Sequence, residues 1–138
     1  MHDMSIATSV KKILIADDEP DILEIIQYNL QKEGYEVITA KNGSEAIDMA
    51  IKNRPDLIIL DIMMPGKNGI EVCNLLRLKP VFNETLIVFL TALSDESTEV
   101  KGLETGADDY ITKPISPKVL VSKVNALFRR VIKDDISL

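Results

Sequence analysis

The sequence predicts an α/β fold, a doubly wound parallel sheet of five strands with helices on both faces in a three-layer sandwich. Three observations lead to this prediction. Strand-like and helix-like segments alternate along the 138 residues, which is typical of a parallel sheet with crossover helices. Three of the strand-like segments are apolar runs, as strands buried on both faces are. Short right-handed connections between neighbouring parallel strands then favour a doubly wound sheet.

The five strands are predicted as short segments over residues 12–17, 36–40, 56–61, 86–90 and 110–111. The five helices are predicted from apolar residues at helical spacing, over residues 20–33, 44–53, 69–77, 95–105 and 117–132. Pro20 suits the first turn of the first helix, and Gly34 ends that helix. Asn42-Gly43 is a turn signal, and Ser44 is the expected N-cap of the second helix.

Proline and glycine residues also mark the ends of the later helices. Pro65-Gly66 forms a turn before the third helix, Gly106 ends the fourth, and Pro117 begins the fifth. The length fits one domain, which we expect over residues 11–132. Residues 1–10 are an expected N-terminal tail, and residues 133–138 are a C-terminal tail or the start of a linker.

Composition excludes several classes of function. The chain has 22 acidic and 16 basic residues, a formal charge of −6, which disfavours direct nucleic-acid binding. Its apolar runs are far shorter than a membrane helix, and we see no secretory signal. A single cysteine, Cys73, cannot form an internal disulfide and fits a reducing compartment, so we expect the cytoplasm. With one histidine, His2, the composition excludes His/Cys metal sites and Ser-His or Cys-His catalysis.

Polar residues stand where the predicted strands end, and in open α/β sheets ligands bind beyond the carboxyl ends of the strands. The polar residues at four strand ends are Asp17-Asp18-Glu19, Asp61, Thr91 and Lys113-Pro114. If the first and third strands are neighbours, then Asp17, Asp18 and Asp61 converge. Three such carboxylates repel each other, and a bound Mg²⁺ or Mn²⁺ ion would relieve the repulsion.

This set of residues predicts a site for a phosphoryl group. A divalent cation and Lys113 would neutralise the phosphoryl oxygens, and the Thr91 hydroxyl would donate a hydrogen bond. Asp61 is the expected nucleophile, which gives an aspartyl-phosphate, because it ends the central apolar strand. Each residue alone has a simpler interpretation. Asp17-Asp18-Glu19 could cap a helix, Thr91 could bond to backbone, and Lys113 could be a solvated loop residue.

The chain resembles the receiver domain of two-component response regulators along nearly its whole length. The matching residues, in order, are Asp17-Asp18, Asp61, Met63, Pro65, Gly69, Thr91-Ala92, Tyr110 and Lys113-Pro114. The resemblance implies a flavodoxin-like fold with strand order 2-1-3-4-5. It also implies that Asp61 accepts a phosphoryl group from a sensor histidine kinase, so that the domain acts as a switch and not as an enzyme in the usual sense.

The resemblance also implies roles for the other site residues. Asp18 and Asp61 would hold Mg²⁺ directly, the backbone carbonyl of Met63 would join them, and Asp17 would act through water. Lys113 would pair with the phosphate, with Thr91-Ala92 beside it. Thr91 would turn toward the phosphoryl group and Tyr110 would rotate inward, which alters the surface of the fourth helix, fifth strand and fifth helix. The peptide bond between Lys113 and Pro114 is expected to be cis.

Residues 103–114 look most like the class that carries a winged-helix DNA-binding domain, so the expected output is transcription through a domain not in this chain. Members of that class dimerise through charge pairs on the switch surface. One such pair is absent here, because Glu99 and Val119 occupy its positions. Asp109 with Lys123 could supply another, so a homodimer through this surface stays an expectation.

Four other functions compete with this one. A stand-alone receiver would act by protein–protein contact. A metal-dependent phosphohydrolase would need a second acid where Met63 stands. A flavin carrier would need a phosphate loop where Asp17-Asp18-Glu19 would repel a phosphate. A pseudo-receiver, which only binds, would not need the complete acceptor site.

Overall fold

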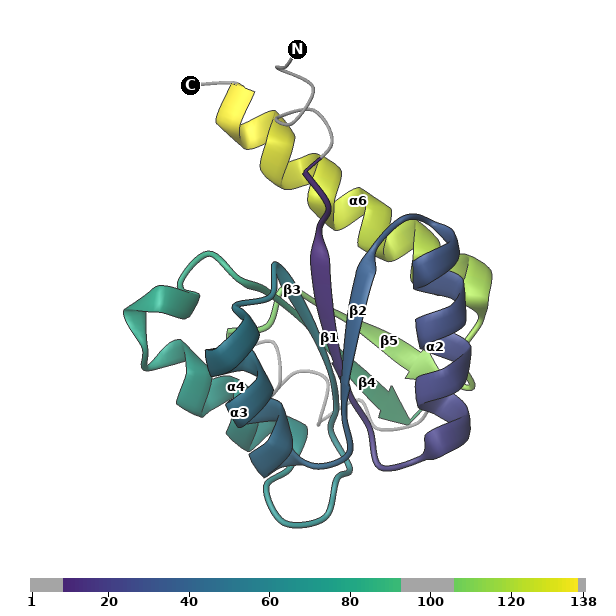
Figure 1. Ribbon diagram of the computed structural model, residues 1–138, viewed down its shortest axis with the longest axis vertical. Coiled ribbons are helices and arrows are strands. Elements are labelled where there is room, and N and C mark those ends of the chain that lie inside the picture. Colours follow the sequence, from purple (N-terminus) through teal and green to yellow (C-terminus); the bar gives the residue numbers. More distant parts are fainter. Residues whose placement is uncertain (1–8, 93–105, 137–138) are drawn as a thin grey trace.

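The computed structural model describes residues 9–92 and 106–136 (Figure 1). Its five strands are β1 (Lys12–Ala16), β2 (Glu36–Ala40), β3 (Leu57–Asp61), β4 (Leu86–Ala92) and β5 (Asp109–Lys113). Its helices are α2 (Pro20–Lys32), α3 (Gly43–Asn53), α4 (Gly69–Arg77), the short 3₁₀-helix η1 (Pro80–Phe82) and α6 (Pro117–Ile136). The strands are all parallel, in the order β2-β1-β3-β4-β5, which confirms the predicted fold class.

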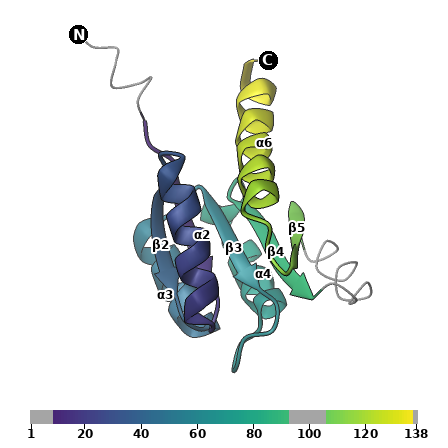
Figure 2. The same cartoon turned by 90° about the vertical axis from the view of Figure 1, so that its right-hand side faces the viewer.

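Helices cover both faces of the sheet, as Figures 1 and 2 show. One face packs on α3 and α4, in a core that includes Ala50, Val72 and Leu76. The other face packs on α2 and α6, in a core that includes Ile26 and Val124. Every residue of β3 is buried, because this central strand has a helical layer on each side.

The observed elements differ from the prediction at several ends. β4 and β5 are longer than their apolar runs, because Ala92 pairs with Lys113 and Val88 with Asp109 in their ladder. Ser44 as N-cap was wrong, since Asn42 accepts a 2.8 Å hydrogen bond from the backbone N–H of Glu45. Asparagine is favoured at the N-cap position because its short amide side chain reaches the unpaired N–H groups of the first helical turn.

Four further predictions concern the second half of the chain. The third helix is confirmed as α4, and the fifth, α6, continues to Ile136. The cis peptide bond between Lys113 and Pro114 is confirmed. The helix predicted over 95–105 lies outside the described residues. Among the described residues, no helix is long and apolar enough to cross a membrane.

Arg77, at the end of α4, anchors the entrance to β5. Its guanidinium donates to the backbone carbonyls of Phe82, at 2.6 Å, and Gly106, at 3.1 Å. It also forms a 3.1 Å ion pair with Asp108, whose carboxylate accepts a 2.9 Å hydrogen bond from the backbone N–H of Ile87. The start of β5 is thus fixed to both α4 and β4, which sets the position of the residues that follow.

The loop after Asp61 is held by two close backbone approaches. A Cβ at Gly69 would stand 2.5 Å from the carbonyl oxygen of Asp61, and a Cβ at Gly43 would stand 2.3 Å from that of Lys67. Both distances are shorter than real side chains tolerate, and both neighbours are backbone atoms. Only glycine therefore lets α3 and α4 approach this loop so closely.

The first prediction concerns Gly69. Gly69→Ala should lower the free energy of unfolding by about 1–3 kcal/mol, because the new methyl group overpacks the backbone of Asp61. Urea unfolding would measure the change, with Asn74→Ala at an exposed position of α4 as the control. Equal stability of the two variants would contradict the steric explanation.

Candidate functional site

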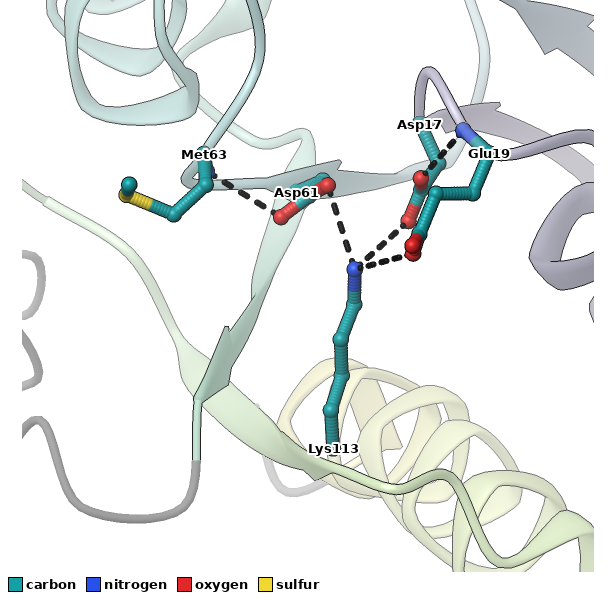
Figure 3. Close-up of polar contacts among 5 residues, drawn as sticks. All are labelled: Asp17, Glu19, Asp61, Met63 and Lys113. Carbon is teal, nitrogen blue, oxygen red and sulfur yellow. Dashed lines mark hydrogen bonds and ion pairs between the residues drawn. The ribbon is translucent and has the colours of Figure 1, made fainter.

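Acidic and basic side chains meet at the carboxyl edge of the sheet (Figure 3). Asp17 directly follows β1, Asp61 ends β3, and Lys113 ends β5. The ammonium nitrogen of Lys113 lies 3.2 Å from a carboxylate oxygen of Asp61, of Asp17 and of Glu19. Because β4 lies between β3 and β5, the long lysine side chain spans the end of one strand to reach these acids.

Asp61 is buried, with 3% of its surface exposed, and both its oxygens have partners. Oδ1 accepts a 3.1 Å hydrogen bond from the backbone N–H of Met63, and Oδ2 accepts one from Lys113. The side chain of Met63 points away from the carboxylate in Figure 3 and is largely exposed. Met63 therefore contributes to the site through its backbone.

Asp17 is fully buried, and its two oxygens differ. Oδ1 accepts a 2.9 Å hydrogen bond from the backbone N–H of Glu19. Oδ2 makes no hydrogen bond with any residue of the described chain, although it lies 3.2 Å from the ammonium of Lys113. Burial raises the pKa of Asp17 to about 6, and the charge of Asp61 adds to this, while the Glu19 N–H and Lys113 oppose it.

Lys113 keeps its charge in this setting. Burial alone would lower the pKa of the ammonium, but Asp61 and then Asp17 outweigh burial, so that the pKa of Lys113 is raised. The site therefore holds a permanent positive charge beside two buried carboxyl groups.

The acidic residues form a candidate metal centre. Asp17, Asp18 and Asp61 each offer an oxygen, and these oxygens lie within 4.8 Å of one another. Asp18 is exposed, so the group opens to solvent on one side. Carboxylate oxygens suit hard divalent cations, and the oxygen of Asp17 without a hydrogen bond is free to accept a further one, from a metal-bound water for example. The residues present therefore fit Mg²⁺ or Mn²⁺.

Thr91 and Ala92 end β4 between Asp61 and Lys113. Thr91 is buried, and its hydroxyl lies 3.5 Å from the carbonyl oxygen of Ala92. Tyr110 is half-buried in β5 and packs against the core on the α3 and α4 side.

The structure describes three of the four residues that the sequence analysis considered for a dimer interface. Asp109 and Lys123 form a 3.4 Å ion pair within the chain. Val119 is 46% exposed on α6, and Glu99 lies outside the described residues.

Glu19 is a site residue that the sequence analysis did not single out. It stands at the N-cap position of α2 but makes no side-chain cap hydrogen bond there, so the helix-capping interpretation is wrong for its carboxylate. The carboxylate contacts Lys113 instead. The only signal in the sequence was its place as the third acid after the first strand.

Comparisons with known proteins agree with this geometry. The family model of the response regulator receiver domain matches residues 13–125. The alkaline phosphatase synthesis transcriptional regulatory protein PhoP of Bacillus subtilis is 50% identical over 120 residues, which are 87% of this chain and 49% of PhoP. The chain thus spans about half the length of this curated relative.

Solved structures are similar over most of the chain. The chemotaxis response regulator CheY4 of Vibrio cholerae has a TM-score of 0.81 and 33% identity, and the match covers 86% of this chain and 98% of that one. The BeF₃-activated N-terminal receiver domain of RstA from Klebsiella pneumoniae has a TM-score of 0.77 and 34% identity, with 84% and 97% covered. This chain belongs to the response regulator receiver domain family, whose members are signalling switches.

Proposed function

We propose that this domain accepts a phosphoryl group on Asp61 from the phosphohistidine of a sensor histidine kinase. A carboxylate oxygen of Asp61 forms the new bond to phosphorus, the phosphorus–nitrogen bond breaks, and the imidazole nitrogen keeps the electron pair. The observation that carries the proposal is the ammonium of Lys113, 3.2 Å from the buried carboxylate of Asp61. This fixed positive charge stands where phosphoryl oxygens would gather.

The acidic residues would hold a magnesium ion, for which manganese is a possible substitute. Asp18, Asp61 and the backbone carbonyl of Met63 are the proposed direct ligands, and Asp17 would act through water. When bound, the ion would neutralise negative charge on the phosphoryl oxygens. The raised pKa of Asp17 supports this assignment, because a buried acid in a crowded acidic group gains most from a nearby cation.

Phosphorylation of Asp61 would alter the protein surface through three further residues, Thr91, Ala92 and Tyr110. The Thr91 hydroxyl turns toward the phosphoryl group, Ala92 lines the same strand end, and Tyr110 rotates inward from β5. The surface that would change is that of the helix predicted over residues 95–105, of β5 and of α6. The charge added at Asp61 would thus shift the equilibrium between two arrangements of this surface.

The proposed output is transcription, through a DNA-binding domain outside this chain. Its support is the 50% identity to a transcriptional regulatory protein. We propose that Asp109 and Lys123 contribute to a homodimer interface. The proposed location is the cytoplasm. A stand-alone receiver that acts through protein contacts is the alternative. A phosphohydrolase is disfavoured because Met63 replaces its second acid with an exposed thioether side chain.

The second prediction tests the acceptor. With Mg²⁺ and acetyl phosphate, the chain should gain the mass of one phosphoryl group, and Asp61→Asn should gain none, because an amide is a poor nucleophile. Intact-mass spectrometry measures the gain, with exposed Asp48→Asn on α3 as the control. A gain that persists in Asp61→Asn would refute Asp61 as the acceptor. Size-exclusion profiles of the same samples would test dimerisation.

The third prediction concerns pH. The native state holds the proton of Asp17 up to about pH 6, whereas the unfolded chain releases it near 3.8, so the native state binds more protons between these values. Without metal, stability should therefore fall as pH rises through this window, by at most about 3 kcal/mol. Asp17→Asn should remove this fall and be more stable than the parent at neutral pH. Urea unfolding at several pH values measures the effect, and parallel curves for parent and variant would contradict it.

The fourth prediction concerns the metal. Mg²⁺ should raise the free energy of unfolding by about 1.4 kcal/mol for each tenfold increase above its dissociation constant. Asp18→Asn should move this response to higher Mg²⁺ concentration, because an exposed ligand is lost without disturbing the core. Asp48→Asn serves again as the control. If Asp18→Asn responds to Mg²⁺ like the parent, Asp18 is not a ligand.

A further inference from the structure

Two charged side chains complete the backbone hydrogen bonds of Tyr110. β5 is the outer strand in the order β2-β1-β3-β4-β5, so one of its edges has no strand beside it in the described sheet. The backbone N–H of Tyr110 donates to a carboxylate oxygen of Asp109 at 2.8 Å, and its carbonyl accepts from the ammonium of Lys123 at 2.8 Å. Asp109 and Lys123 thus take the place of a neighbouring strand at this one residue.

Lys123 also contacts the aromatic ring of Tyr110. Its ammonium nitrogen lies 5.1 Å from the ring centroid, within the range of a cation–π interaction. Lys123 comes from α6, which packs on one face of the sheet, whereas Tyr110 packs against the core of the other face. The lysine therefore reaches past the edge of the sheet, where its 3.4 Å ion pair with Asp109 holds the ammonium in place.

The two kinds of contact respond differently to a rotation of the tyrosine side chain. The backbone hydrogen bonds can survive such a rotation, because they do not involve the ring. The cation–π contact cannot survive it, because its geometry depends on the face of the ring. A switch that moves the ring must therefore break the contact with Lys123.

We propose that Lys123 is a positioning residue for Tyr110, which holds the ring in its present rotamer in the unphosphorylated domain and so opposes activation. This inference rests on the proposed function, in which Tyr110 rotates when Asp61 is phosphorylated. A ligand that favours the rotated state must work against the Lys123 contact. Removal of the contact should make such a ligand bind more tightly.

The experiment observes Tyr110 directly. The chain has three tyrosines and no tryptophan, so 3-fluorotyrosine labelling gives three ¹⁹F resonances, and Tyr110→Phe assigns that of Tyr110. The intact chain is titrated with beryllofluoride and Mg²⁺. Lys123→Met should move the Tyr110 resonance of the free protein toward its beryllofluoride position. It should also lower the half-saturating beryllofluoride concentration about two- to fivefold, the value of one exposed cation–π contact.

Two controls separate the ring contact from general charge effects. Lys118→Met removes an exposed lysine from the same helix and should change neither value. Lys123→Arg keeps the cation and should also behave like the parent. If Lys123→Met moves the resonance but leaves the half-saturating concentration unchanged, or matches Lys118→Met in both, the proposal is wrong. Lys123→Gln repeats the test should the methionine variant fail to fold.

The same spectra distinguish failure of the proposed function. Bound beryllofluoride has its own ¹⁹F signals, so a parent that binds none, or that binds it without movement of Tyr110, argues against the phosphorylation switch. The resting resonance of Lys123→Met, compared with Lys118→Met, still reports whether the ammonium holds the ring. A resting Tyr110 resonance that is equal in these two variants overturns the role of Lys123.

Discussion

Carboxylates crowded at one edge of the sheet repel each other, and a single lysine compensates this repulsion. The architecture of the domain depends on this electrostatic constraint. Asp17 and Asp61 are both buried, and burial of uncompensated charge is costly. Lys113 compensates them only because the strand order brings the end of β5 within one side-chain length of β1 and β3. The topology and the electrostatics of the site therefore depend on each other.

Close backbone packing keeps this arrangement in place. Gly69 allows α4 to approach the carbonyl of Asp61, and Arg77 at the other end of α4 fixes the entrance to β5. One helix thus sets the position of an acid on β3 and contributes to that of Lys113 on β5. The compensation is nonetheless incomplete, since the pKa of Asp17 is still raised to about 6. In the proposed function, a bound divalent cation would relieve the repulsion that remains.

The sequence predicted the strands and most helices well, because apolar runs and helical spacing report burial directly. It missed the full extent of β5 and the cap at Asn42, because strand pairing and cap geometry depend on neighbours that a local pattern does not include. At the site, Asp17, Asp61 and Lys113 were predictable because each stands at, or directly after, the end of a strand, and these strand ends meet at one edge of the sheet. Glu19 was not singled out, since its contact with Lys113 joins residues far apart in the chain. The sequence analysis paired Asp109 with Lys123 across a dimer interface, whereas the structure shows an ion pair between them within one chain.

The outer edge of β5 in the described sheet also bears on whether a strand of another chain can pair with it. An outer strand presents unpaired N–H and C=O groups, and these can template a strand from another molecule. At Tyr110 both groups are already bonded, one to a carboxylate and the other to an ammonium. A strand that approached here would have to displace two charged groups from their partners. At Tyr110, the Asp109–Lys123 pair therefore disfavours the addition of a strand to this edge.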